Sequence, residues 1–112
     1  MIEGIYQITF RGAADWGMGM LVLKEGTITG ADVGGILYDG TYSDRDDNIE
    51  VNITLTVPAG ATLVQGTPPR PTEQKVPFTA SFRKPDSENR QPILVVLPPG
   101  PVNVIFNRLR KL

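Results

Sequence analysis

The stretch ILYDGTYSDRDDNIEVNITLTV, residues 36–57, decides the fold because it has the pattern of two strands joined by a polar connection. Side chains of a β-strand alternate between its two faces, so a hydrophobic period of two indicates a half-buried strand. The apolar faces comprise Ile36, Tyr38, Gly40 and Tyr42 in the first strand, and Ile49, Val51, Ile53, Leu55 and Val57 in the second. Residues 43–48 are polar turn formers, so the sequence predicts an antiparallel hairpin with an acidic tip.

Six other segments have the length and composition of short strands, and none of the chain shows helical periodicity. The predicted strands are residues 4–10, 17–23, 27–32, 76–83, 92–97 and 102–109. Consecutive strands with short connections build a meander, and eight of them leave no long exposed edge if the sheet closes. The sequence therefore predicts an all-β, antiparallel, up-and-down barrel of about eight strands, a single domain over residues 1–112. A two-sheet sandwich is the alternative.

The positions of glycine and proline residues indicate where turns and loops connect the strands. Residues 24–26 predict a tight turn with Gly26 at positive φ, whereas residues 85–91 and 98–101 predict a polar turn and a sharp connection. Residues 58–75 include Pro68, Pro69 and Pro71, which a central strand would not accept, so we expect a surface loop with local order over residues 61–64. A loop of this length is either functional or mobile. The predicted strand 17–23 is apolar almost throughout. This indicates either that both of its faces are covered or that a neighbouring backbone approaches closely at its glycines.

Composition excludes several classes of function. The chain has no cysteine and no histidine, which removes thiol chemistry, the commonest general base and the commonest transition-metal ligand. A net charge of -1 argues against a nucleic-acid-binding protein, and no apolar run is long enough to span a bilayer. No signal peptide is evident at the amino terminus, so we expect a cytoplasmic protein that is not an enzyme and has no cofactor.

Two groups of side chains are candidate sites. Asp44, Asp46 and Asp47 form the acidic tip; a calcium loop would need glycine at position 49, where this chain has Ile49, so we expect a solvated tip rather than a metal site. Trp16, Tyr6, Tyr38 and Tyr42 are expected in the core, with a ligand cavity or partner surface as the alternative. The basic segment 108–112 is expected to be a solvated strand end rather than a membrane or nucleic-acid contact.

The order of glycines, aromatic residues and turn residues resembles the GrlR-like family, small bacterial proteins named after a negative regulator of type III secretion genes. The resemblance covers residues 4–57, and the remainder agrees in strand pattern and length. It is carried by Gly4-Ile5-Tyr6-x-Ile8-x-Phe10, Gly17-x-Gly19, Gly26-x-Ile28-Thr29-Gly30-x-Asp32 and Tyr38-x-Gly40.

The resemblance implies a lipocalin-like (calycin) barrel that forms a homodimer and sequesters a transcriptional activator through an acidic surface motif. That motif falls on Asp44, Arg45, Asp46 and Asp47, where Arg45 interrupts the acidic run. The leading hypothesis is thus regulation by protein–protein interaction, without direct contact to nucleic acid or membrane. The alternative is a carrier of a small apolar ligand in a barrel cavity lined by Tyr6, Phe10, Tyr38, Phe78 and Phe106.

Overall fold

A computed structural model describes residues 3–84 and 91–112, and all of its regular structure is β-strand. Eight strands follow one another along the chain, as the sequence predicts. They are β1 (Gly4–Arg11), β2 (Trp16–Lys24), β3 (Thr27–Asp32), β4 (Leu37–Arg45), β5 (Asn48–Val57), β6 (Gln74–Arg83), β7 (Ile93–Leu97) and β8 (Gly100–Lys111). Within the predicted polar turn, residues 85–90 lie outside the described residues.

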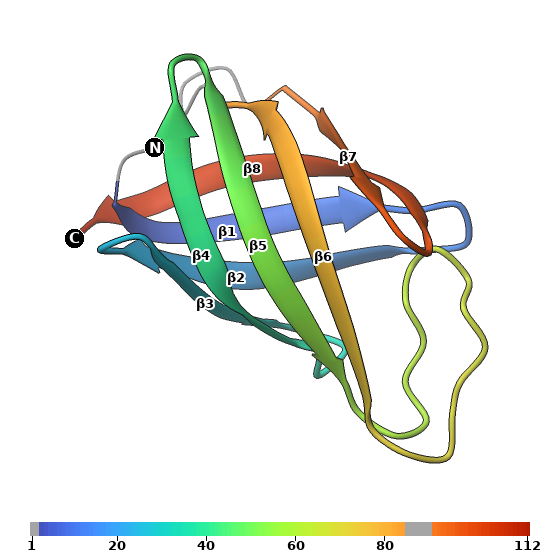
Figure 1. The fold of residues 1–112 in the computed structure, drawn as a ribbon. Coiled ribbons are helices and arrows are strands. Elements are labelled where there is room, and N and C mark those ends of the chain that lie inside the picture. The colour runs from blue at the N-terminus through green and yellow to red at the C-terminus, as the bar shows by residue number, and fades with distance from the viewer. Residues whose placement is uncertain (1–2, 85–90) are drawn as a thin grey trace.

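The strands form one antiparallel sheet in the order β6-β5-β4-β3-β2-β1-β8-β7. β1 pairs with both β2 and β8, so the two ends of the chain meet in the middle of the sheet. The sheet curls until its outer strands, β6 and β7, face each other and nearly close it (Figure 1). The predicted up-and-down barrel is confirmed, and the sandwich alternative is wrong. Segment 108–112 continues β8 as far as Lys111.

The core lies inside the curl, and the hairpin of β4 and β5 supplies much of it. Tyr38 lies opposite Leu55, and Tyr42 opposite Val51, in the register of β4 and β5. Ile49, buried almost completely, also belongs to this inner face, as predicted. Thr56 points outward yet is buried, and its hydroxyl accepts a hydrogen bond from Lys75 Nζ at 2.8 Å. The alternation of the sequence therefore corresponds to the inside and outside of the barrel.

Three inward-facing glycines on neighbouring strands allow the sheet to bend. A Cβ on Gly19, Gly30 or Gly40 would lie 2.7, 2.3 or 2.0 Å from a carbonyl oxygen of the adjacent strand. They form a diagonal line across β2, β3 and β4, because Gly30 pairs with Leu21 rather than with Gly19 and Gly40 pairs with Ile28. Glycine kinks of this kind give a sheet the curvature that closure requires. In β2 the close approach, and not two covered faces, explains the glycines: Met20 is exposed on its outer side.

The hairpin tip is narrower than predicted. Asp44 pairs with Ile49 and Arg45 with Asn48, so both belong to β4 and the turn itself consists of Asp46 and Asp47. Asp46 has a φ of 56°, a left-handed conformation that aspartate tolerates and that two-residue hairpin turns require. The turn after β2 is similar, with positive φ at both Glu25 and Gly26.

Residues 58–73 form an irregular loop, as predicted, but hydrogen bonds hold it against the barrel. The carbonyl oxygen of Val64 accepts hydrogen bonds from the backbone N–H groups of Ala14 and Asp15, at 2.9 and 3.0 Å. The N–H of Gly60 donates to Arg70, which joins the two sides of the loop. Local order over residues 61–64 is thus confirmed: Leu63 is buried and packs with the core.

Replacing Gly40 with alanine should destabilise the protein, because the new methyl group would collide with the backbone of β5 rather than with a flexible side chain. We expect the free energy of unfolding to fall by about 1–3 kcal/mol, as for other overpacked sites. Urea denaturation measures this change. Thr41→Ala, at the exposed neighbouring position of β4, is the control and should cost less than about 1 kcal/mol. Equal costs for the two variants would contradict the proposed bend.

Candidate functional site

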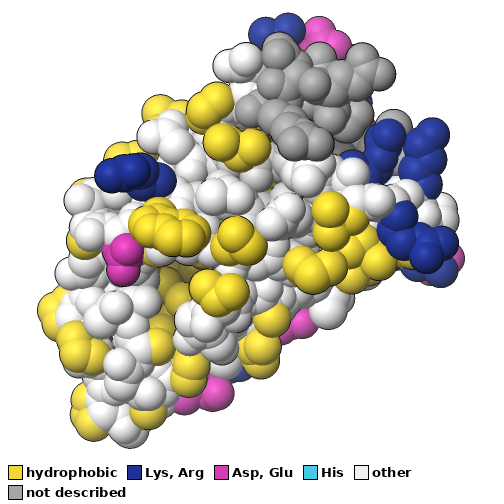
Figure 2. All heavy atoms as spheres, turned by 180° about the vertical axis from the view of Figure 1, so that it is seen from behind, with side chains coloured by type: hydrophobic (Ala, Val, Ile, Leu, Met, Phe, Trp, Pro, Cys, Tyr) yellow, Lys and Arg dark blue, Asp and Glu magenta, His cyan; other side chains and the backbone are white. Residues whose placement is uncertain are grey.

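The barrel encloses a cavity of about 500 Å³. Its lining includes residues of the connections 12–15, 33–36 and 58–73 at one end of the barrel, and it extends along the strands to Ile49 and Phe82 near the other end. On the face opposite to that of Figure 1, hydrophobic side chains gather in and around a hollow (Figure 2). The volume falls within the range of roughly 300–1,000 Å³ that is typical of small-molecule sites.

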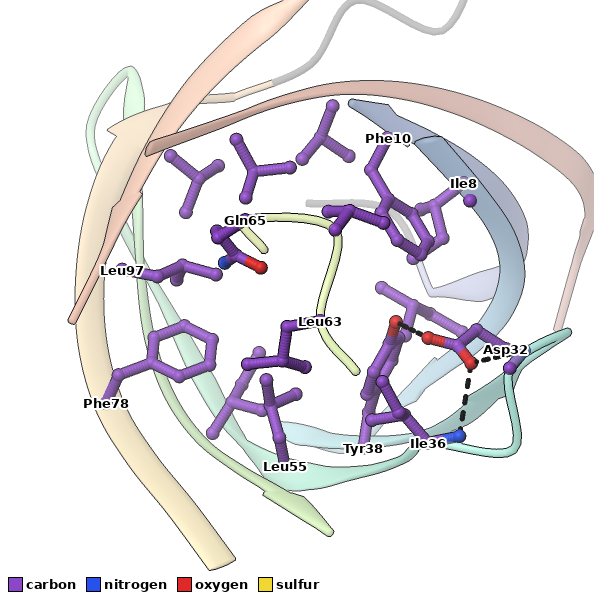
Figure 3. Close-up of a pocket in the computed structure, with 18 of the residues that line it drawn as sticks. Ile8, Phe10, Asp32, Ile36, Tyr38, Leu55, Leu63, Gln65, Phe78 and Leu97 are labelled. Atoms are coloured by element: carbon purple, nitrogen blue, oxygen red, sulfur yellow. Dashed lines mark hydrogen bonds between the residues drawn. The ribbon is translucent and has the colours of Figure 1, made fainter. Parts of the chain in front are cut away.

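The wall of the cavity is mainly apolar. Aliphatic and aromatic side chains of all eight strands surround it, and Figure 3 shows many of them pointing toward its centre. The largest apolar members are Ile8, Phe10, Trp16, Leu21, Leu23, Ile28, Ile36, Tyr38, Ile49, Ile53, Leu55, Leu63, Phe78, Phe82, Leu97 and Phe106. Such a lining favours apolar molecules, because water gains few hydrogen bonds there.

One carboxylate is built into the wall. Asp32 ends β3, and its Oδ1 accepts hydrogen bonds from the N–H groups of Gly34 at 2.9 Å and Ile36 at 3.1 Å. This is the bond pattern of an Asx turn, and it shapes the bend before β4. The other oxygen, Oδ2, accepts a hydrogen bond of 2.5 Å from the hydroxyl of Tyr38 (Figure 3). Both oxygens of the Asp32 carboxylate thus have hydrogen-bond donors.

Tyr38 is the matching donor from β4. Burial raises the pKa of Tyr38 well above its ordinary range, and both the hydrogen bond to Asp32 and the charge of Asp32 raise it further. The hydroxyl therefore stays protonated at physiological pH. As a result, the pair is a neutral phenol that donates to a carboxylate.

The mouth of the cavity has a different character. Trp16, the one tryptophan of the chain, is 59% exposed and contributes to the lining beside Asp15. Leu63 enters from loop 58–73, and Figure 3 shows it reaching into the middle of the ring of side chains. Gln65 of the same loop points its amide into this space (Figure 3). The loop thus covers part of the open end while it supplies both apolar and polar atoms.

Four of the five residues predicted to line a cavity do so: Phe10, Tyr38, Phe78 and Phe106. Tyr6 is the exception, because it lies outside the cavity wall. It is buried, and its ring packs edge-on against Phe106 with the centroids 6.4 Å apart. The expectation of a core position is confirmed for Tyr6 and Tyr38 but is wrong for Trp16. Tyr42 is half-buried and packs against the core.

Sequence reasoning missed Asp32 and Asp15 as cavity residues. The signal for Asp32 was present, since an aspartate followed by Val33, Gly34 and Gly35 at the end of a strand is typical of an Asx turn. No local sequence pattern indicates that Asp15, which lies in the connection between β1 and β2, lines the cavity.

The predicted acidic tip carries mixed charge. Asp44 forms an ion pair with Lys84 at 3.7 Å, and Arg45 forms one with Glu50 at 3.4 Å. Because Asp44 and Arg45 are consecutive in a strand, their side chains point to opposite faces. Asp46 and Asp47 form the exposed turn itself. The four residues 44–47 are therefore close in space but do not present one continuous acidic surface.

Within residues 3–84 and 91–112, no group of three or more acidic side chains is arranged to hold a metal ion. This part of the chain also contains no helix long and apolar enough to cross a membrane. In comparisons with known proteins, the chain matches no protein-family model and no curated protein.

Tyr38 and Asp32 should be energetically coupled. Tyr38→Phe removes the only donor to Oδ2 that the described residues provide, and a hydrogen bond to a charged group contributes about 1.5–3 kcal/mol. We expect Tyr38→Phe and Asp32→Asn each to lower the free energy of unfolding. The double variant should lose less than the sum, with a coupling of about 0.5–3 kcal/mol. Urea denaturation of the four proteins measures it, and strictly additive losses would contradict the interaction.

Proposed function

We propose that this protein binds a small apolar ligand inside the barrel. The observation that carries the proposal is the partly open cavity of about 500 Å³ inside the barrel, with its predominantly apolar wall. A cavity of this size in a folded core is costly, because its lining atoms forgo the contacts that close packing would give them. A ligand that fills it would restore those contacts and would stabilise the folded state in proportion to its concentration.

The surroundings of the cavity support binding rather than catalysis. Its polar lining consists of Asp15, Asp32, Thr62, Gln65 and the hydroxyl of Tyr38. Asp32 and Tyr38 are occupied with each other and with the backbone of the bend. A few fixed polar groups in an apolar wall are the features with which binding sites orient a ligand. Because loop 58–73 covers the open end of the barrel only in part, a ligand could enter there.

Filling the cavity should abolish binding. Val104 lines the cavity from β8, whereas Val96 is exposed on the outer side of β7, so Val104→Trp and Val96→Trp form a matched pair. We expect the unmodified protein and Val96→Trp to bind N-phenyl-1-naphthylamine, a neutral probe whose fluorescence rises in apolar surroundings. Val104→Trp should bind it at least about tenfold more weakly, since tryptophan occupies the ligand's volume. Equal titration curves for both variants, or no binding to the unmodified protein, would contradict the proposal.

A second proposal comes from the resemblance to the GrlR-like family: a homodimer that regulates transcription by holding an activator protein at the hairpin tip. The observation that favours it is the exposure of Asp46 and Asp47 at the apex of a turn. Asp44 and Arg45 would then position the apex through their ion pairs with Lys84 and Glu50. Interspersed basic residues reduce the long-range attraction of a basic partner, so this surface would act mainly through close contacts.

The double variant Asp46→Lys, Asp47→Lys tests the second proposal. Exposed substitutions usually change stability by no more than about 0.5 kcal/mol, so the melting temperature should change little. A partner retained from cell lysate by the unmodified protein, and identified by mass spectrometry, should be lost with this variant. Asp39→Lys, at an exposed position of β4 away from the tip, is the control and should retain it. Equal retention by both variants would remove the tip from the interaction.

A further inference from the structure

The charged groups of the cavity define the kind of ligand that it accepts. Asp15 and Asp32 are the ionisable acidic residues in its lining, and no lysine or arginine among the described residues joins them. The two carboxylates come from different connections, since Asp15 precedes β2 and Asp32 ends β3. Both lie toward the mouth, so the polar end of a bound amphiphile would meet negative charge and no fixed positive charge.

Among the described residues, three groups donate hydrogen bonds to the carboxylate of Asp32. The N–H groups of Gly34 and Ile36 and the hydroxyl of Tyr38 all donate to it. Ionised carboxylates offer about four lone-pair positions, so three donors leave one acceptor position open. Because the pKa of Tyr38 is raised, its hydroxyl keeps its proton and remains a neutral hydrogen-bond donor.

Trp16 adds a second attraction for a cation. Its exposed ring lies at the mouth next to Asp15 in the chain, and the backbone N–H of Trp16 donates to Asp15 Oδ1 at 2.8 Å. Ammonium groups are attracted to the face of an indole ring, and this attraction grows when water is partly excluded. A carboxylate head group would instead meet two like charges at the mouth, and their repulsion would oppose its binding.

We propose that the cavity selects an amphiphile with an apolar chain and an amine head group, and that it discriminates against fatty acids. This inference rests on the proposed binding of an apolar ligand and specifies its chemical class. The apolar chain would lie among the side chains of the strands, and the ammonium group would lie at the mouth near Asp15, Asp32 and the ring of Trp16. Attraction by charge at the head group and burial of the chain would act together.

Three ligands with the same chain separate the effects: decylamine, decanol and decanoate, titrated at pH 7 by calorimetry below their micelle-forming concentrations. We expect decylamine to bind at least about tenfold more tightly than decanoate, with decanol in between. Raising the salt concentration should narrow this ratio, because it screens the charges near the mouth. Val104→Trp should weaken the binding of all three ligands, which assigns the binding to the cavity.

Substitutions that remove one charge locate the preference. Asp32→Asn retains an oxygen that can accept from Gly34 and Ile36, and Asp15→Asn retains one for Trp16. Each should reduce the ratio of the decylamine to the decanoate affinity several-fold. Asp39→Asn, an exposed carboxylate of β4 outside the cavity lining, should leave that ratio unchanged. If Asp32→Asn does not fold, as judged by its melting transition, Asp15→Asn decides alone.

The possible failures are distinguishable. If none of the three ligands binds, the proposed function itself is wrong. If decanol binds and decanoate binds as tightly as decylamine, apolar binding stands and the amine preference is overturned. If the preference is present but neither Asp15→Asn nor Asp32→Asn reduces it, the assignment to these two carboxylates is overturned.

Discussion

The bend of the sheet along Gly19, Gly30 and Gly40 is the constraint on which the rest of the structure depends. An eight-stranded sheet can bring its outer strands together only if it coils strongly, and coiling brings neighbouring backbones close on the concave side. At these positions the adjacent carbonyl oxygens occupy the space of a Cβ. Any side chain there would hold β2, β3 and β4 apart and flatten the sheet. β6 could then not approach β7, and the inner faces would be open to water instead of enclosing a cavity.

Once the sheet closes, the interior of the barrel must also be covered at its ends. Loop 58–73 folds over one end, where Val64 accepts two hydrogen bonds from the connection between β1 and β2. Leu63 enters the interior from this loop and fills part of it. The remaining space is bordered by side chains such as Phe10 and Phe78 that are only partly buried. The fold thus places an apolar volume directly beneath its longest irregular segment.

Apolar segments of strand length were sufficient to predict the eight strands, and alternation was sufficient to predict the inward faces of β4 and β5, because both depend on local periodicity and on the burial of apolar area. Features that depend on individual backbone conformations were not accessible. The left-handed φ of Asp46 shortens the hairpin turn and moves Asp44 and Arg45 into β4, although either conformation suits an aspartate. Tryptophan is usually a largely buried residue, yet the side chain of Trp16 is 59% exposed. The contact of Asp32 with Tyr38 joins two strands, so a local pattern reveals at most the turn.

The mouth of the cavity and the hairpin tip lie at opposite ends of the same strand. β4 begins after the bend shaped by Asp32, close to the cavity mouth, and ends at the acidic turn. Nine residues in extended conformation span roughly 30 Å, which exceeds the distance at which substitutions usually influence each other directly. Substitutions at the mouth and at the tip should therefore act independently. If an occupied cavity changed the affinity of the tip, the shortest connection would be Ile49, which lines the cavity and pairs with Asp44. Because β4 and β5 are joined by a continuous ladder of backbone hydrogen bonds, such coupling would require a shift of the hairpin backbone.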